Sequence, residues 1–241
     1  MNNALKEIDC IILCGGLGKR LKDVVGDRPK ALAQINQKPF LDILIDYLMS
    51  FDCNRVILCI GHSGDVIKAY YQQKKMSAEV IFSQEQELLG TGGALKNAQG
   101  LIQSETFLVM NGDSFCAVDL NALLDFHAKK DAVLSMVLAE LDSSSDYGNV
   151  TVVDDARIKA FQEKPSSSRS SLMNAGVYCM RRDIFSHMPD QSSFSLERDV
   201  FPQMLSAPCY GFVTTASCID IGTPERYKEA QKILAKESLS S

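Results

Sequence analysis

The chain has no tryptophan and only three histidines, and none of its eight cysteines belongs to a C-x-x-C pair. Without paired cysteines or ligand-spaced histidines, the sequence carries no signal for a zinc site or a disulfide framework. Most of the cysteines lie in apolar stretches, where a free thiol packs as a small hydrophobic group. We therefore expect reduced cysteines, and structural roles for His62, His127 and His187.

A long apolar segment and a basic tract are also missing. No apolar run approaches the roughly 20 residues needed to cross a membrane, and residues 2–9 are too polar for a signal peptide. The 241 residues carry a net charge of −5 with scattered lysines and arginines, which argues against a nucleic-acid surface. The composition predicts a cytoplasmic globular protein that binds small molecules rather than nucleic acid or a membrane.

The chain does have a glycine-rich segment directly after an apolar run at residues 8–13. Gly15, Gly16 and Gly18 are followed by two cations, Lys19 and Arg20. Glycines let bare backbone N–H groups approach an anion, and cations neutralise its charge. A second cationic segment, Arg-Pro-Lys, follows at residues 28–30. The first thirty residues therefore predict a phosphate-binding loop at the end of a first strand.

This segment does not fit two familiar phosphate loops. A P-loop needs Ser or Thr after its lysine, but Arg20 follows Lys19. The dinucleotide fingerprint needs a third glycine where this chain has Leu21. The remaining pattern, G-G-x-G-x-R-L followed by R-P-K, resembles the signature of the sugar-phosphate nucleotidyltransferases. That family usually has Thr or Ser at the position of Lys19.

Apolar periodicity in the first half alternates between strands and helices. Continuous apolar runs predict strands at residues 8–14, 55–60, 79–82, 106–111 and 132–138. Helix-spaced apolar residues predict helices at residues 40–51, 64–73, 93–101 and 120–129. The alternation predicts an α/β fold with a doubly wound, Rossmann-like, mostly parallel sheet.

The second half has shorter runs. They predict a hairpin of residues 149–153 and 157–162, strands at 175–180, 210–213 and 217–219, and helices at 196–205 and 223–236. No linker separates two independent units. We therefore expect one domain over residues 1–241, with a nucleotide-binding half (1–130) and an antiparallel sugar-binding half (131–236).

The resemblance implies nucleotidyl transfer, in which an oxygen of a sugar 1-phosphate attacks the α-phosphorus of a nucleoside triphosphate and pyrophosphate leaves. Both reactants are anions, so the protein's main tasks are positioning and charge neutralisation. Arg20 would bind the β and γ oxygens, and Lys30 would lie near the α-phosphate. With Asp113, these are the expected catalytic residues. The other nucleotide-binding residues expected from the first motif are Leu13, Gly15, Gly16, Gly18 and Lys19.

A second glycine-rich block, residues 90–95, follows Glu85. In the family the corresponding block holds the nucleobase and opens a helix, so Glu85, Gly90 and Thr91 are expected to contact the nucleotide. The glycines of the block would allow close backbone approach to the base or ribose. A carboxylate at residue 85 could accept the paired N–H donors of guanine, or the single N–H of uracil or thymine.

Two aspartates lie at predicted strand ends: Asp113 after Asn-Gly, and Asp220 between two isoleucines. An unpaired carboxylate in apolar surroundings is costly, and a metal ion would compensate it. The resemblance implies that both aspartates hold one Mg²⁺, whose octahedral preference for oxygen suits carboxylates, phosphate and water. On the sugar side, the resemblance implies that Gly148 and Asn174 bind the ring, Glu163 accepts from hydroxyls, and Lys164 binds the sugar phosphate.

Within the family, the chain is most similar to the bacterial heptose 1-phosphate guanylyltransferases. The similarity lies in the block at residues 89–95, the Asn-Gly-Asp-Ser segment and residues 193–197. It implies GTP and a heptose 1-phosphate as substrates. Mannose 1-phosphate guanylyltransferases and N-acetylmuramate 1-phosphate uridylyltransferases are the alternatives inside the family. A non-catalytic regulatory homologue would lack a catalytic cation or a metal aspartate, whereas all are present. A glycosyltransferase would generally have a D-x-D motif, which is absent. A monomer or small homo-oligomer is expected.

Overall fold

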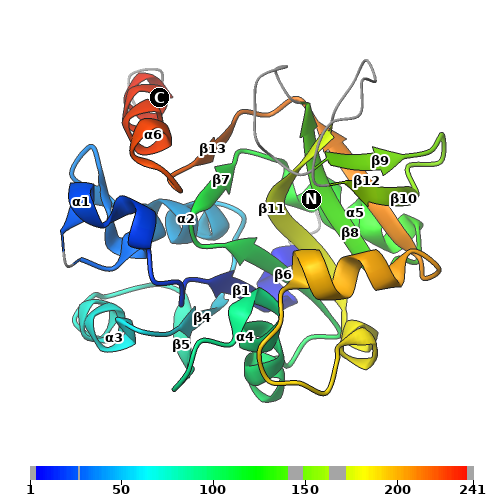
Figure 1. The fold of residues 1–241 in the computed structure, drawn as a ribbon, viewed down its shortest axis with the longest axis horizontal. Coiled ribbons are helices and arrows are strands. Elements are labelled where there is room, and N and C mark those ends of the chain that lie inside the picture. Colours follow the sequence, from blue (N-terminus) through cyan, green and yellow to red (C-terminus); the bar gives the residue numbers. More distant parts are fainter. Residues whose placement is uncertain (1–3, 27, 141–148, 163–171, 238–241) are drawn as a thin grey trace.

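The computed structural model describes residues 4–26, 28–140, 149–162 and 172–237, shown in Figure 1. Within them, nine strands form one sheet: β1 (Cys10–Leu13), β4 (Arg55–Ile60), β5 (Glu79–Gln84), β6 (Thr106–Asn111), β8 (Leu134–Glu140), β9 (Asn149–Val152), β10 (Ile158–Gln162), β11 (Leu172–Arg181) and β12 (Cys209–Thr214). Two short ribbons pair β2 (Gln34–Ile35) with β3 (Lys38–Pro39), and β7 (Ser114–Cys116) with β13 (Cys218–Asp220).

The helices connect and cover this sheet. The α-helices are α1 (Lys22–Val25), α2 (Phe40–Met49), α3 (Gly64–Gln72), α4 (Gly90–Ala98), α5 (Leu120–Lys129) and α6 (Pro224–Glu237). Short helical segments are η1 (Ala4–Glu7), η2 (Lys19–Leu21), η3 (Lys30–Leu32), η4 (Gln99–Leu101), η5 (Arg182–His187), η6 (Leu196–Val200) and η7 (Phe201–Met204). Among the described residues, no helix has the length and apolar character needed to cross a membrane.

The first half of the sheet is parallel. Strand β1 lies between β4 and β6 and runs parallel to both, and β5 is parallel to β4 on the other side. The central strands β1, β4 and β6 are mostly apolar because helices cover both faces of the sheet, whereas β5, at the edge, has exposed polar residues at both ends. The α/β class and the parallel strands of the first half predicted from the sequence are confirmed, as is the antiparallel hairpin of β9 and β10.

Strand β8 follows β6 in the β-α-β alternation of the chain, but it does not lie beside β6 in the sheet. Strand β11 is inserted between β6 and β8 and is antiparallel to both, while β8 is parallel only to β12. Chain order does not determine lateral order in a sheet. As a consequence, the beginning of β11, with Asn174, lies at the same edge of the sheet as the end of β6.

The predicted helix at 196–205 is wrong in its form, because η6 and η7 replace one regular helix. Pro202 lacks an N–H and would break the i→i−4 ladder at this point. The helix predicted at 93–101 begins earlier, at Gly90.

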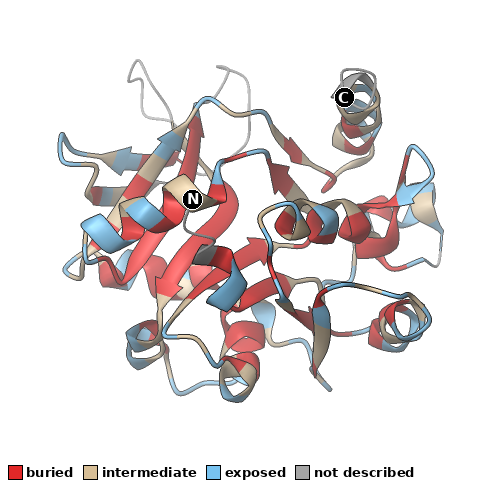
Figure 2. Cartoon of the chain, turned by 180° about the vertical axis from the view of Figure 1, so that it is seen from behind, coloured by how far each residue is buried: buried red, intermediate tan, exposed pale blue. Residues whose placement is uncertain are grey.

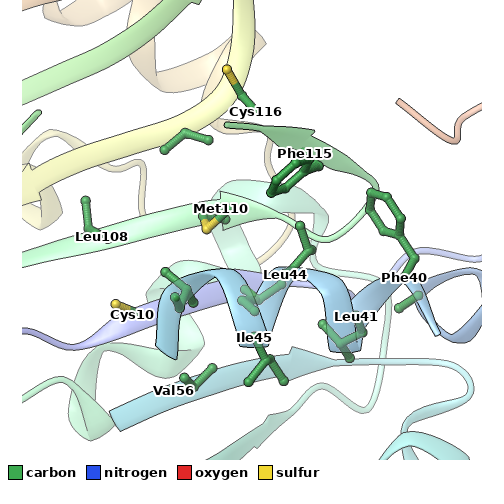
Figure 3. Packing of buried hydrophobic residues seen from close by; sticks show 14 of the residues in the cluster. Cys10, Phe40, Leu41, Leu44, Ile45, Val56, Leu108, Met110, Phe115 and Cys116 are labelled. Carbon is green, nitrogen blue, oxygen red and sulfur yellow. The ribbon is translucent and has the colours of Figure 1, made fainter. Parts of the chain in front are cut away.

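Side chains that alternate along each strand fill two cores, one on each face of the sheet. Cys10 and Ile12 of β1 belong to the core under α2 and α5, whereas Ile11 belongs to the core under α4, η6 and η7. Figure 2 shows the buried strands running through the centre of the molecule, and Figure 3 shows Leu44 and Ile45 of α2 packed against the strands. Each fully buried aliphatic or aromatic side chain contributes about 1.5–3 kcal/mol to stability.

One histidine is buried within this framework. His127 of α5 is 4% exposed, and its Nδ1 lies 2.9 Å from the hydroxyl of Ser135 in β8. Its Nε2 has no hydrogen-bond partner among the described residues. Burial, aided by the charge of Arg181, lowers the pKa of His127 to about 4.

We expect His127 to make the fold sensitive to acid. Below pH 6.5 the unfolded chain binds a proton at this histidine and the folded chain does not, so the free energy of unfolding falls until the pH reaches about 4. Between pH 7.5 and pH 4.5 the loss attributable to this group is about 2–3 kcal/mol. Urea unfolding of the wild type and of His127→Gln at both pH values measures it. Equal losses in the two proteins would contradict this assignment.

Candidate active site

A cavity of about 420 Å³ opens beside the ends of β1 and β6. The ends of adjacent parallel strands are a common position for ligand sites in α/β folds. Four segments line it: the loop after β1, the start of η3, residues 85–94, and residues 111–113. The sequence-predicted residues that it brings together are Leu13, Gly15, Gly16, Lys30, Glu85, Gly90, Thr91 and Asp113.

Gly112 allows the two central strands to meet at the cavity floor. Its N–H donates to the Leu13 carbonyl at 2.9 Å. A Cβ at Gly112 would lie 2.8 Å from both that carbonyl oxygen and Cys14 Cβ, closer than real Cβ contacts come. The absence of a side chain at residue 112 therefore places Asp113 directly beside the glycine loop.

Lys30 and Asp113 form an ion pair across the cavity. Lys30 Nζ lies 2.7 Å from Asp113 Oδ2, and the lysine side chain is 13% exposed. Gly18 makes this position of Lys30 possible, because its φ is +59° and a Cβ there would lie 2.9 Å from Lys30 Cβ. Gly18 itself does not line the cavity; it contacts the stem of the lysine that does.

Glu85 lies under the glycine loop, in space that two glycines leave open. A Cβ at Gly15 would lie 2.9 Å from Glu85 Oε1, and a Cβ at Gly61 would lie 2.5 Å from the same oxygen. The other carboxylate oxygen accepts the Leu89 N–H at 3.3 Å. Burial raises the pKa of Glu85. The carboxylate is thus held in a partly desolvated position facing the cavity.

The expectation for the 90–95 block needs a correction. The N–H groups of Gly92 and Gly93 donate to the Phe194 carbonyl, at 3.0 and 3.2 Å. Side chains at these two glycines would overlap the Phe194 ring and the Ser192 carbonyl. The space beside Gly92 and Gly93 is therefore occupied by the segment before η6 and not by a ligand. Gly90 and Thr91, in contrast, line the cavity.

A hydrogen-bonded network that the sequence analysis missed joins the two halves of the site. Thr91 Oγ1 and Ser195 Oγ donate to Glu197 Oε2 at 2.7 and 2.8 Å. The Tyr178 hydroxyl donates to Glu197 Oε1 at 3.3 Å and accepts from Asn174 Nδ2 at 2.8 Å. Glu197 thus connects Thr91, which lines the large cavity, to Asn174, which lines a smaller one. The contact of Thr91 with Glu197 joins residues 106 positions apart, so local sequence carries no signal for it.

Asn111 is a second residue that the sequence analysis did not assign. It lines the cavity next to Asp113, and its Oδ1 is buried without a hydrogen-bond partner among the described residues. A buried amide oxygen without a partner is costly, which favours a ligand donor at this point. Its place at the end of β6, before Gly112, is the signal that could have indicated it.

Asp220 lies on the ribbon that continues from Asp113. Strand β13 pairs with β7 so that Asp220 is opposite Ser114, and the Ile221 N–H donates to the Asp113 carbonyl at 2.9 Å. The Asp220 carboxylate accepts from the Gly222 N–H and from Arg226 Nη1, the latter at 3.3 Å. Asp220 and Asn174 line a smaller cavity, separate from the one that Asp113 lines.

Comparison with known proteins identifies the family of the chain. Residues 9–237 match the family described as Nucleotidyl transferase. The chain belongs to this family. It is 38% identical to the D-glycero-alpha-D-manno-heptose 1-phosphate guanylyltransferase of Aneurinibacillus thermoaerophilus, over 94% of this chain and 98% of that protein. Its fold is similar to that of HddC from Yersinia pseudotuberculosis, solved in complex with GMP-PN (TM-score 0.83, 35% identity, 94% of this chain and 99% of that one).

A more distant member of the family is also similar. The mannose-1-phosphate guanylyltransferase of Mycobacterium tuberculosis is 30% identical over 93% of this chain, which corresponds to 64% of that longer protein. The family predicted from the glycine-rich and cationic motifs is therefore confirmed.

The donor set of this nucleotidyl transferase suits a hard cation. Asp113 and Asp220 offer only carboxylate oxygens, and no group of three His, Cys, Asp or Glu ligands gathers among the described residues. An ion held by these two carboxylates would be one that keeps water and phosphate oxygens as its other ligands, as Mg²⁺ does. Zinc would require more nitrogen or sulfur ligands.

Several predicted residues of the nucleotidyl transferase are not brought to the large cavity. Arg20 is exposed on η2, outside the lining, and nothing is described of the Lys19 side chain. The sugar-side candidates Gly148, Glu163 and Lys164 lie outside the described residues, so only Asn174 can be placed.

Adding a methyl group at Gly18 tests its contact with Lys30. In Gly18→Ala the new Cβ would collide with Lys30 and would require a positive φ, so we expect the lysine to shift and turnover to fall by roughly 10- to 100-fold. Steady-state kinetics measures the loss. Gly100→Ala is the matched control because a Cβ there meets nothing within 4 Å. Unchanged turnover in Gly18→Ala would show that Lys30 needs no such constraint.

Proposed function

We propose that this protein transfers a guanylyl group from GTP to D-glycero-α-D-manno-heptose 1-phosphate, giving GDP-heptose and pyrophosphate. The observation that carries the proposal is the cavity in which Lys30 meets Asp113 between the glycine loop and Glu85. The heptose-specific names of relatives that are 34–38% identical over nearly their full lengths support the choice of sugar.

Lys30 is proposed to neutralise the α-phosphate as the sugar phosphate attacks it. Its ammonium is held at 2.7 Å from Asp113, so it is already oriented toward the site rather than toward solvent. Arg20, exposed on η2, has the length and free reach to bind the β and γ oxygens of the leaving pyrophosphate. The reaction is a direct in-line displacement, without a covalent enzyme intermediate.

Asp113 and Asp220 are proposed to hold one Mg²⁺. When bound, the ion would neutralise phosphate oxygens and orient the triphosphate. Each carboxylate has one cationic neighbour, Lys30 or Arg226, which limits the charge repulsion between the two aspartates before metal binds.

Glu85 is proposed to select guanine. A desolvated carboxylate accepts well from two parallel N–H donors, which guanine presents at N1 and N2. Uracil and thymine present one such donor, so they would make one fewer hydrogen bond to the carboxylate.

Asn174, together with Gly148, Glu163 and Lys164, is proposed to bind the heptose phosphate. Mannose 1-phosphate is the second candidate, favoured by the 30% identity to a mannose-1-phosphate guanylyltransferase. A monomer or small homo-oligomer is proposed. A pyrophosphate-release screen of GTP, UTP, dTTP, CTP and ATP against heptose, mannose and N-acetylmuramate 1-phosphates distinguishes the candidates. Preference for a nucleotide other than GTP would overturn the guanylyl assignment.

Removing either member of the cavity ion pair should abolish most of the activity. We expect Lys30→Ala and Asp113→Ala each to lower kcat by about 10²-fold or more, because each deletes charge stabilisation that the transition state needs. Lys38→Ala is the control: it breaks a lysine–aspartate pair of similar length, 2.6 Å, between exposed side chains. Circular dichroism checks folding. Near-normal turnover in either site variant would show that its role is misassigned.

Changing Glu85 to glutamine should weaken the choice of base. The amide keeps one acceptor but turns a donor toward guanine, so we expect kcat/KM for GTP to fall by about tenfold or more. ITP lacks the 2-amino donor and should lose less. Measuring the GTP/ITP ratio for wild type, Glu85→Gln and the control Glu79→Gln tests this; Glu79 is at the opposite end of β5. An unchanged ratio in Glu85→Gln would remove Glu85 from base recognition.

A further inference from the structure

The ribbon of β7 and β13 connects the two candidate metal aspartates, and it also carries two cysteines. Strand β7 begins immediately after Asp113, and β13 ends at Asp220 (Figure 1). Cys116 and Cys218 are direct partners in the antiparallel register of this ribbon. Both are free thiols in the structure.

The hydrogen bonds of the ribbon show which kind of pair the cysteines form. The Ala117 N–H donates to the Ser217 carbonyl at 3.3 Å, and the Ile221 N–H donates to the Asp113 carbonyl at 2.9 Å. In an antiparallel ladder the hydrogen-bonded pairs alternate with non-hydrogen-bonded ones. Residues 117 and 217 therefore form a hydrogen-bonded pair, and Cys116 and Cys218 form the next, non-hydrogen-bonded pair. Such pairs have Cα atoms about 4.5 Å apart, within the range that a disulfide spans.

The two thiols face each other on one side of the ribbon. The neighbouring Cys218 thiol, together with burial, raises the pKa of the Cys116 thiol above its usual range. Cys116 lies on the opposite side of β7 from Phe115 in Figure 3. The next pair on the cysteine side is Ser114 with Asp220, because alternate residues of a strand share a face.

Cys218 is the more exposed of the two cysteines, because Cys116 is 0% exposed. Cys218 is half-buried and lines the small cavity that Ser114, Asn174 and Asp220 also line. A second pair of interacting thiols, Cys10 and Cys53, offers a contrast inside the same molecule. Those residues are 0% and 3% exposed, so an oxidant would have to enter the core to reach them.

We propose that Cys116 and Cys218 form a reversible cross-strand disulfide when the protein meets a peroxide, and that this disulfide slows the enzyme. The modification itself depends only on the ribbon geometry and on access to Cys218. The effect on turnover rests, in addition, on the proposed role of Asp113 and Asp220.

The chemistry needs a peroxide as its oxidant. The Cys218 sulfur attacks one peroxide oxygen, an S–O bond forms, the O–O bond breaks, and the departing hydroxide takes up the thiol proton as water. The Cys116 sulfur then attacks the Cys218 sulfur, the S–S bond forms, the S–O bond breaks, and a second water leaves with the proton of Cys116. The two thiols give up two electrons, and hydrogen peroxide is reduced to two molecules of water.

Closing the disulfide changes the ribbon next to the site. The sulfur atoms must move from contact distance to a bond of about 2.05 Å, and the Cβ–S–S–Cβ dihedral is then fixed near ±90°, a geometry that the backbone at residues 116 and 218 must adjust to. Asp220 is two residues from Cys218 on the same face, and Asp113 is bonded to the same ribbon through Ile221. A displacement of about 1 Å at a catalytic site can reduce turnover by roughly 100-fold.

Peptide mapping after oxidation tests the modification directly. Reduced wild type, Cys218→Ser and the control Cys53→Ser are treated with hydrogen peroxide, alkylated and digested without reductant. We expect a linked peptide pair containing Cys116 and Cys218 in the wild type and in Cys53→Ser, with two thiols lost, and no such link in Cys218→Ser. Cys218→Ala is a second variant in case the serine impairs folding. Absence of the link in wild type, or a link through other cysteines, would overturn the proposal.

Turnover measured on the same samples tests the consequence. We expect guanylyl transfer by oxidised wild type and Cys53→Ser to fall about tenfold or more and to recover with dithiothreitol, whereas Cys218→Ser loses no activity reversibly. A mapped disulfide with unchanged turnover would overturn the regulatory effect. If reduced wild type transferred no guanylyl group at all, the proposed function would be wrong. Peptide mapping would still show whether the disulfide forms.

Discussion

The ion pair of Lys30 and Asp113 is the contact on which the candidate site depends. The two residues are 83 positions apart, yet their charged atoms lie 2.7 Å from each other. Two glycines make the contact possible: Gly18 leaves room for the lysine stem, and Gly112 lets the ends of β1 and β6 touch. In each case a single Cβ would separate groups that the site needs together. The ion pair of Lys30 and Asp113 therefore depends on the absence of side chains at Gly18 and Gly112.

Glycines also shape the remaining walls of the site. In each wall, the space that a missing side chain leaves in one segment is occupied by another segment. Gly15 and Gly61 leave the volume that the Glu85 carboxylate fills, and Gly92 and Gly93 leave the volume that Phe194 and Ser192 fill. Only the first of these arrangements exposes a polar group to the cavity. The second seals helix α4 against η6 and brings Glu197 within hydrogen-bond distance of Thr91.

The insertion of β11 gives the two halves of the molecule a common edge. Because β11 is antiparallel to β6, its first residues lie where the parallel strands end. Asn174 is thereby linked through Tyr178 to Glu197 and on to Thr91. The ribbon of β7 and β13 adds the second aspartate beside the same edge. Thr91, which lines the large cavity, and Asn174, which lines the smaller one, are thus joined by one hydrogen-bonded network.

The amino-acid sequence alone determined the α/β class, the strand–helix alternation of the first half, and the motifs that indicate the family. These features depend on local periodicity and on short patterns such as the glycine loop, so they can be read without knowing which segments are neighbours. Only the tertiary structure decided the lateral position of β8 and β11, the true neighbours of Gly92 and Gly93, the network around Glu197, and the pairing of Cys116 with Cys218. Each of these depends on contacts between segments far apart in the chain, and hydrophobic periodicity specifies which face a residue occupies but not which segment packs against it.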